Sequence, residues 1–254
     1  MLRMTGNEIS LREAIQQTLD GKLSGPALLR RFMTHDDWRV PVHVDAEGKQ
    51  FPVYIKDTDD QRFALYFTDE QGYQDGCAAI GAELMGERVL RLAGRTLFLN
   101  LGDDADIISI NWNSPPQIFF KKAQVPSLRR WAQAVNVEHT LMSPTPDLSL
   151  LKHFDAFYIV LQKIPEGFAL VLAPDAHDRK LAAVFTAEDA LEAFLKDERI
   201  GKFEFEPVTR TVPGQQLFED LQDMPLDGIA FNCAGPVPQR RFAAALANAV
   251  VTAP

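Results

Sequence analysis

Two short histidine–aspartate groups are the parts of this sequence whose residue types could bind a metal ion. His35 is followed by Asp36 and Asp37, and His43 lies two residues before Asp45. Imidazole and carboxylate groups are ordinary metal ligands. However, no His-x-x-x-His pair occurs, and neither cysteine stands at zinc-ligand spacing from a histidine. Solvated turn residues explain both groups better, so the sequence predicts no metal site.

Calcium binding and catalysis have equally little support. Acidic runs at residues 57–60 and 103–106 lack the glycine and the distal glutamate of a twelve-residue calcium loop. The sequence has no Gly-x-Ser-x-Gly elbow, no phosphate-binding loop and no Gly-x-Gly-x-x-Gly fingerprint. We therefore predict no catalytic residues, no cofactor and a protein that is not an enzyme. An enzyme assembled from scattered residues remains an open alternative.

Two asparagines stand where α/β sheets often bind ligands. Asn111 and Asn232 each end a predicted buried strand, and ligands commonly bind at the carboxyl ends of such strands. Asparagine also tolerates the left-handed backbone of a turn, so a ligand pocket and a structural turn both stay open. Thr68 and Thr186 are predicted to begin helices, because a threonine hydroxyl can accept a hydrogen bond from a first-turn amide.

Composition restricts the class of partner. The chain has 26 basic and 35 acidic residues, a formal charge of −9. The charge divides into −3 for residues 1–142 and −6 for residues 143–254, so neither half has the basic excess of a nucleic-acid binder. Cys77 and Cys233 are far apart, as in a reduced protein. The N-terminus shows no signal-peptide pattern and no apolar run could span a bilayer, so we expect a cytoplasmic protein away from membranes.

Apolar spacing predicts alternating strands and helices. Ser10 and Glu13 have the spacing of a capping box at the start of the first helix. Apolar residues at every second position indicate strands, and apolar residues that recur about every 3.6 positions indicate helices. Strands are predicted at residues 39–44, 51–55, 63–67, 89–92, 107–111, 157–161, 168–172, 181–185, 203–208 and 227–231; helices at 8–20, around 28–33, from Thr68, and at 96–101, 187–196, 215–221 and 238–250.

The order of these elements repeats within the chain. Three pairs of matching residues are separated by 118 to 121 positions: Phe67 and Phe185, Phe98 and Phe218, and Asn111 and Asn232. A repeat this long predicts two duplicated α/β domains, each a mixed sheet flanked by helices. We place them at residues 1–142 and 143–254, joined by the proline-containing segment 142–147.

The repeat also predicts an additional segment in the first domain. Residues 129–132, Arg-Arg-Trp-Ala, match residues 240–243, Arg-Arg-Phe-Ala, at a separation of only 111 positions. About ten residues between 112 and 125 would then have no counterpart. Apolar rings with a polar rim outside a shared framework are typical of a docking surface. Its candidate residues are Trp112, Asn113, Phe119, Phe120, Lys121 and Lys122. Alternatively, Phe119 and Phe120 seal a contact between the two domains.

Each half resembles the SseB family of bacterial proteins, named for an enhanced serine-sensitivity phenotype. Three motifs carry the resemblance over most of residues 25–250. They are an aromatic–Thr helix start (residues 65–68 and 183–186), a Gly-x-x-Leu-Phe helix (residues 94–98 and 214–218), and a buried strand that ends in Asn before a proline turn (residues 111–115 and 232–236). Trp112 and Cys233 stand where the family usually has proline. The resemblance implies a mixed α/β domain and no established catalytic chemistry.

The predicted function is a non-enzymatic protein-interaction or regulatory module whose partner is an unidentified protein. The alternative is a sensor that binds an amino acid or a nucleotide in a pocket at the strand ends around Asn111 and Asn232. Neither the oligomeric state nor the domain that carries the binding surface follows from the sequence.

Overall fold

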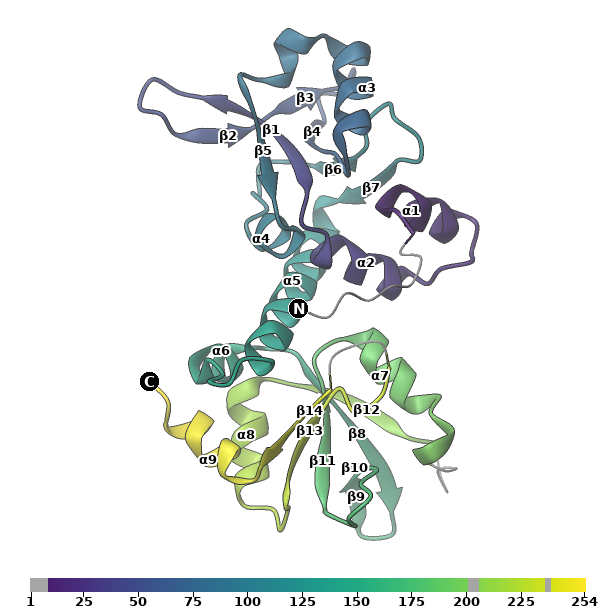
Figure 1. The fold of residues 1–254 in the computed structure, drawn as a ribbon, viewed down its shortest axis with the longest axis vertical. Coiled ribbons are helices and arrows are strands. Elements are labelled where there is room, and N and C mark those ends of the chain that lie inside the picture. The colour runs from purple at the N-terminus through teal and green to yellow at the C-terminus, as the bar shows by residue number, and fades with distance from the viewer. Residues whose placement is uncertain (1–8, 201–205, 236–238) are drawn as a thin grey trace. The chain divides into compact units, whose positions relative to one another are not determined.

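The computed structural model describes residues 9–200, 206–235 and 239–254, except for the side chain of residue 199. The chain has an α/β fold that divides into two compact units, residues 1–132 and 133–254 (Figure 1). The division lies inside helix α5 (Val125–Leu141), ten residues before the expected boundary at 142 and 143. In the second half of this helix, which belongs to unit 2, Glu138 accepts a hydrogen bond from the Thr186 hydroxyl.

Unit 1 contains a three-stranded and a four-stranded sheet, built from three hairpins, the antiparallel strand β5 and one parallel contact. The strand order is β2-β1-β5 in one part and β3-β4-β6-β7 in the other, with β4 and β6 parallel. A single bridge between Arg39 and Phe67 connects β1 to the end of β4. The elements are α1 (Leu11–Leu19), α2 (Gly25–Thr34), β1 (Trp38–Val44), β2 (Gln50–Pro52), β3 (Tyr54–Lys56), β4 (Arg62–Tyr66), α3 (Glu70–Ile80), η1 (Ala82–Met85), β5 (Arg88–Leu92), α4 (Gly94–Leu99), β6 (Ile107–Ile110), β7 (Ile118–Lys121) and η2 (Lys122–Gln124).

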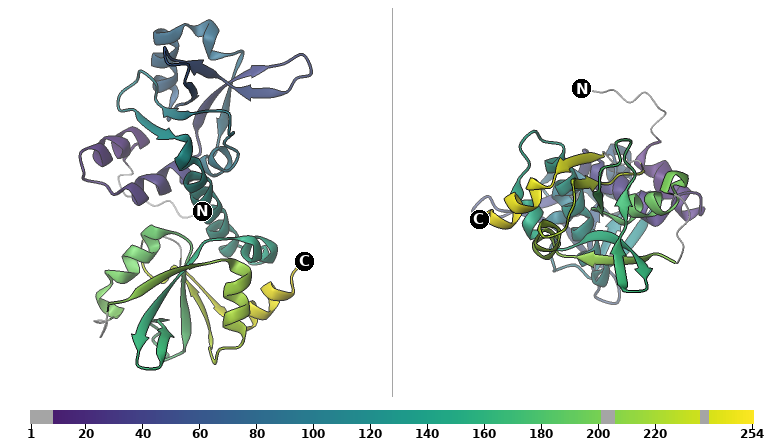
Figure 2. Two further views of the ribbon diagram at one scale, coloured as in Figure 1. Left: turned by 180° about the vertical axis from the view of Figure 1, so that it is seen from behind. Right: turned by 90° about the horizontal axis from the view of Figure 1, so that it is seen from below.

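Unit 2 joins its strands into one seven-stranded sheet with a similar strand order. The order is β12-β8-β11-β13-β14, with β9 beside β8, β10 beside β11, and β11 parallel to β13. Helices α8 and α9 lie side by side in this unit (Figures 1 and 2). The elements are α6 (Leu148–His153), β8 (Phe157–Ile164), β9 (Gly167–Leu170), β10 (Leu172–Ala173), β11 (Leu181–Phe185), α7 (Glu188–Leu195), η3 (Glu198–Ile200), β12 (Val208–Val212), α8 (Gly214–Gln222), β13 (Gly228–Phe231), β14 (Arg240–Ala243) and α9 (Ala245–Thr252).

The final hairpin of each unit corrects the expectation of an additional segment at residues 112–125. Ile107 on β6 pairs with Lys121 on β7, 14 positions later. Gly228 on β13 pairs with Ala243 on β14, 15 positions later. The two connections therefore have nearly equal length, and β7 has a counterpart in β14. The match of residues 129–132 to 240–243 equated a helical segment with a strand.

The C-terminal elements differ from prediction in two further places. The helix expected at 238–250 is strand β14 followed by helix α9, because Arg240–Ala243 pairs along β13 before the chain turns into the helix. Of the strand expected at 203–208, residues 206 and 207 precede β12, which begins at Val208. Residues 201–205 and 236–238, which include Pro236 of the predicted turn, lie outside the described residues.

Each sheet buries aromatic rings against helices on both of its faces. In unit 1, Phe67 packs with α3 through Tyr73 on one face. On the other face, Phe32 of α2 stacks on Phe98 of α4, with centroids 6.0 Å apart. In unit 2, α7 and α8 cover the two faces in the same way, through ring pairs Phe185–Phe194 and Phe157–Phe218. The capping box predicted for Ser10 and Glu13 is confirmed at the start of α1.

A glycine brings the first turn of α4 or α8 against a neighbouring carbonyl. The Gly94 N–H donates to His35 O at 2.7 Å, and a Cβ at residue 94 would lie 1.8 Å from Phe32 O. Gly214 does the same in unit 2, where a Cβ would lie 2.1 Å from Leu151 O. Because backbone atoms form these contacts, no rotamer change could relieve the overlap.

We expect Gly94→Ala to lower the free energy of unfolding by about 3 kcal/mol or more, because the helix must move away from the carbonyl. Gly25→Ala is the matched control, since a Cβ at that helix start meets no atom within 4 Å. Chemical denaturation monitored by circular dichroism compares the two variants. A Gly94→Ala variant as stable as Gly25→Ala would contradict the proposed close approach.

Candidate functional site

Asn111 connects the ends of the two parallel strands in unit 1. It is fully buried directly after β6, with a left-handed φ of 58°. Its Oδ1 atom accepts hydrogen bonds from the Thr68 N–H at 2.9 Å and from the Thr68 hydroxyl at 3.1 Å. Its amide nitrogen donates to Pro116 O at 3.2 Å. Both polar atoms of the side chain therefore bond within the fold, across the ends of β4 and β6.

Asn232 forms the same connection in unit 2. Its φ is 49°, its Oδ1 atom accepts from the Thr186 N–H at 3.0 Å, and its amide nitrogen donates to the Thr186 hydroxyl oxygen at 3.0 Å. Buried Glu138 accepts a further hydrogen bond from that hydroxyl. The two asparagines predicted to line a ligand pocket thus each position the chain that leads from a parallel strand into a helix.

The threonines are not themselves the N-caps of these helices. Asp69 caps α3, and its carboxylate accepts from the Gly72 N–H at 2.7 Å. Ala187 occupies the N-cap position of α7 and supplies no side-chain hydrogen bond. Both threonines stand one residue earlier, because their amides and hydroxyls bond to the asparagine side chains. The predicted helix starts are therefore displaced by one residue.

Arg12 of α1 lies over the strand ends of unit 1. Its Nε donates to Asp69 at 2.8 Å, while its other nitrogens bond to the Ser114 hydroxyl and to Pro115 O. Ser114 in turn donates to Asp75, which lowers the pKa of that carboxyl group. A guanidinium with protein partners thus lies where many α/β folds bind a ligand. This arrangement favours a structural role for the strand ends of unit 1.

Three aromatic rings form a cluster on the surface of unit 1 beside the edge strand β7. The centroids of Phe63 and Trp112 are 5.0 Å apart, and Phe119 lies 6.2 Å from Trp112 and 6.5 Å from Phe63, all in edge-to-face geometry. Phe63 is buried, whereas Phe119 is 44% exposed. Lys121 lies two residues further on the same face of β7. We name Phe63, Trp112, Phe119 and Lys121 the β7 surface.

The remaining residues predicted for docking lie elsewhere. Phe120 faces the opposite side of the sheet, is 8% exposed and packs against Phe32 at 6.1 Å. Lys122 is exposed in η2, just beyond the strand. Asn113 is exposed in the turn after β6, with a φ of 54°. The structure therefore brings Trp112, Phe119 and Lys121 together and places Phe120 in the core.

Unit 2 has an arginine at the position that Phe119 occupies in unit 1. Arg241 pairs with Ala230 across the last two strands, as Phe119 pairs with Ser109. Its guanidinium forms an ion pair with Asp175 and donates to Pro174 O at 3.3 Å. An arginine in an ion pair thus occupies the place of the exposed phenylalanine, and the aromatic cluster is particular to unit 1.

Asp175 is the centre of a small charge network in unit 2. The hydrogen bond from Arg179 holds the pKa of the Asp175 carboxyl group far below its usual value. The same carboxylate accepts from the backbone N–H of His177 at 3.0 Å and thereby closes the turn before β11. Because the carboxylate is bonded only in the folded state, its charge is coupled to folding.

Among the described residues, no three His, Cys, Asp or Glu side chains come together in a way that could hold a metal ion. No helix within the described ranges is both long and apolar enough to cross a bilayer.

Comparisons with known proteins place this chain in no family. No protein-family model matches it, and no curated protein matches it. Among solved structures, Anabaena Tic22, a protein of protein transport, is similar over 78% of this chain and 86% of its own, with 9% sequence identity and a TM-score of 0.21. A similarity at that TM-score carries no argument about fold or function.

We expect Asn111→Ala to lower the free energy of unfolding by about 2–4 kcal/mol, because the buried Thr68 amide loses its acceptor and alanine tolerates the left-handed backbone poorly, whereas the Thr68 hydroxyl can still donate to Asp69. Asn113→Ala is the matched control: it has a similar left-handed φ but is exposed, so only the backbone cost of about 1 kcal/mol applies. Urea titration measures both values. Equal losses of unfolding free energy in the two variants would show that the left-handed backbone conformation alone explains the asparagine at position 111.

The depressed pKa of Asp175 predicts a stability contribution that acid removes. The charged carboxylate stabilises the fold above its unfolded pKa of about 4, and the contribution is lost as pH falls toward the lower folded pKa. The melting temperature of Asp175→Asn should therefore lie below that of the natural protein at pH 7, and the difference should shrink steadily below about pH 4. Asp57→Asn, in the turn of unit 1 where Asp57 bonds to backbone amides, is the control. A difference that persists unchanged at pH 2.5, or that Asp57→Asn reproduces, would contradict this assignment.

Proposed function

We propose that the protein is a cytoplasmic, non-enzymatic, SseB-like interaction module that binds another protein through the β7 surface of unit 1. The single observation that supports this most is the exposure of Phe119 within a three-ring cluster. Large aromatic side chains near the centre of an exposed patch are the usual anchors of protein–protein contacts. The equivalent position of unit 2 carries Arg241 in an ion pair, so the common fold does not require an exposed ring there.

The charge beside the ring indicates the chemistry of the partner. Lys121 shares a strand face with Phe119, and Lys122 follows it; both are exposed. No ion pair between either ammonium group and another described residue is present. The chain as a whole carries −9, so this pair of lysines is a local positive site on an acidic protein. We propose a partner segment with an apolar side chain for the rings and an adjacent carboxylate for Lys121.

The partner binds through side chains rather than by adding a strand to the sheet. The Lys122 N–H donates to the carbonyl oxygen of Asp106, the residue directly before β6, at 2.8 Å. The alternation of an antiparallel ladder therefore directs the backbone groups of Phe119 and Lys121 away from β6. The Lys121 N–H already donates to Gln124 Oε1 at 2.9 Å. A short edge strand that carries a lysine, and whose lysine N–H is already hydrogen-bonded, is typical of a sheet edge that is protected against the addition of another strand.

The experiment begins with capture of partners from the native host by the natural protein and by Phe119→Arg, which places the residue of unit 2 at the surface. A photo-crosslinking amino acid at position 119 identifies the contacted segment. We expect the purified partner to bind Phe119→Arg at least about tenfold more weakly, because burying a phenylalanine contributes about 2–3 kcal/mol. Lys121→Glu should weaken binding further as the salt concentration falls, since charge repulsion is then less screened.

Phe168→Ser in unit 2 is the matched control, because Phe168 is 51% exposed on β9 and belongs to the other unit. It should bind the partner like the natural protein. Circular dichroism must show all variants folded. Equal dissociation constants for Phe119→Arg and Phe168→Ser, or crosslinks from position 119 to no protein segment, would overturn the proposal.

A further inference from the structure

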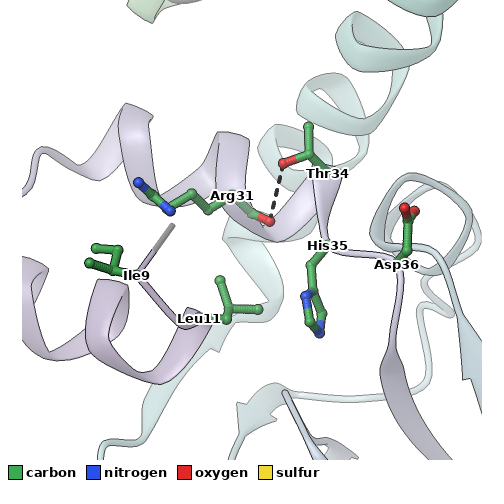
Figure 3. Close-up of a pocket in the computed structure, with 6 residues that line it drawn as sticks. All are labelled: Ile9, Leu11, Arg31, Thr34, His35 and Asp36. Atoms are coloured by element: carbon green, nitrogen blue, oxygen red, sulfur yellow. Dashed lines mark hydrogen bonds between the residues drawn. The ribbon is translucent and has the colours of Figure 1, made fainter. Parts of the chain in front are cut away.

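A pocket opens in unit 1 between the start of α1 and the end of α2. Its volume is about 280 Å³, and its lining consists of Ile9, Leu11, Arg31, Thr34, His35 and Asp36 (Figure 3). This volume is slightly below the roughly 300–1,000 Å³ of sites for drug-sized ligands, so the pocket suits a smaller metabolite. It is separate from the β7 surface and from the two asparagines.

Arg31 and His35 reach the pocket from one side of α2. They are four residues apart, which places them on the same face at the end of this helix. Figure 3 shows the Arg31 guanidinium extending toward Ile9 and the His35 ring beside Leu11. Within the described part of the chain, the Arg31 guanidinium has no hydrogen-bond or ion-pair partner. A guanidinium in this position can bind a carboxylate with two parallel hydrogen bonds.

The tautomer of His35 follows from its partner. His35 Nε2 lies 2.9 Å from Thr68 O. A carbonyl oxygen only accepts, so Nε2 carries the proton, and Nδ1 of the neutral ring is left as an acceptor. The Thr34 hydroxyl already donates to Arg30 O at 3.0 Å. A ligand that bonds to His35 must therefore bring a donor of its own.

The charges around the pocket distinguish between ligand classes. The carboxyl end of α2 carries the negative pole of the helix, which favours a cation. Asp36 adds a carboxylate at the rim. Together they disfavour a doubly charged anion such as a phosphate ester, whereas Arg31 favours one negative charge. Ile9 and Leu11 supply an apolar wall for an aliphatic side chain.

We propose that this pocket binds a small aliphatic α-amino acid. Arg31 holds the carboxylate, Nδ1 of His35 accepts from the ammonium group, and the aliphatic side chain packs against Ile9 and Leu11. The carboxylate, the ammonium group and the side chain of the ligand thus each contact a protein group of complementary chemistry. The site is independent of the β7 surface and does not require a protein partner.

The test is isothermal titration of the full chain with L-leucine, up to about 10 mM, beside a thermal-shift series, since a ligand of the native state raises the melting temperature. We expect L-leucine to bind, and leucinamide, which lacks the carboxylate, to bind at least tenfold more weakly. The hydroxy acid 4-methyl-2-hydroxypentanoate should also bind more weakly than L-leucine, because it lacks the ammonium charge. Phenyl phosphate, a doubly charged anion, should not bind.

Arg31→Gln should weaken L-leucine binding at least tenfold. Arg88→Gln, at an exposed arginine of the same unit, should leave binding unchanged. In the natural protein, L-leucine should shift the nuclear magnetic resonance signal of His35 Nδ1. Phe119→Arg should bind L-leucine normally, which separates this site from the proposed protein contact. No binding by the natural protein, or equal binding by Arg31→Gln, would overturn the proposal.

Discussion

The hydrogen bonds between an asparagine at the end of one parallel strand and the threonine after the other are the constraint on which each unit depends. In α/β folds a chain that leaves a buried strand must turn at once into a helix, and its first amides have no strand partner left. Asn111 and Asn232 each accept a hydrogen bond from the N–H of that threonine, and each forms a second hydrogen bond with its hydroxyl group. A buried amide without an acceptor would destabilise the fold by about 1–3 kcal/mol. The left-handed φ of each asparagine also directs the chain away from the sheet toward the last hairpin.

The two units keep this framework and differ in what they place around it. Arg12 covers the strand ends in unit 1, whereas Glu138 bonds to the corresponding threonine in unit 2. Asp69 caps α3, but Ala187 supplies no cap to α7. On the outer strand, an exposed phenylalanine contrasts with an arginine in an ion pair. Residues that the fold does not require are the ones free to specialise, which is why we base the function on these differences. Descent of both units from a single duplicated ancestor remains our interpretation of their matching strand order.

Local patterns predicted most of the framework from the sequence. Periodic apolar residues indicated the buried strands β4, β6, β11 and β13 within one or two residues at each end. The Ser10–Glu13 spacing correctly predicted a capping box. The sequence-based prediction was wrong where the same residue types suit both a helix and a strand. Arg240–Ala243 resembles a segment of α5 but forms an edge strand, because its partners along β13 lie 9 to 15 positions away in sequence and no local pattern records that pairing.

The amino-acid sequence alone indicated an α/β fold, a recurring order of predicted elements and turns at the two asparagines, and it contains no recognisable catalytic motif. These properties depend on the period of apolar side chains and on the turn preferences of single residues. Only the tertiary structure decided that Phe119 is exposed while Phe120 is buried, that Arg12 reaches the strand ends, and that Arg31 and His35 face one pocket. Burial, salt bridges and pockets are made by residues far apart in the chain, so they follow from packing and not from local spacing.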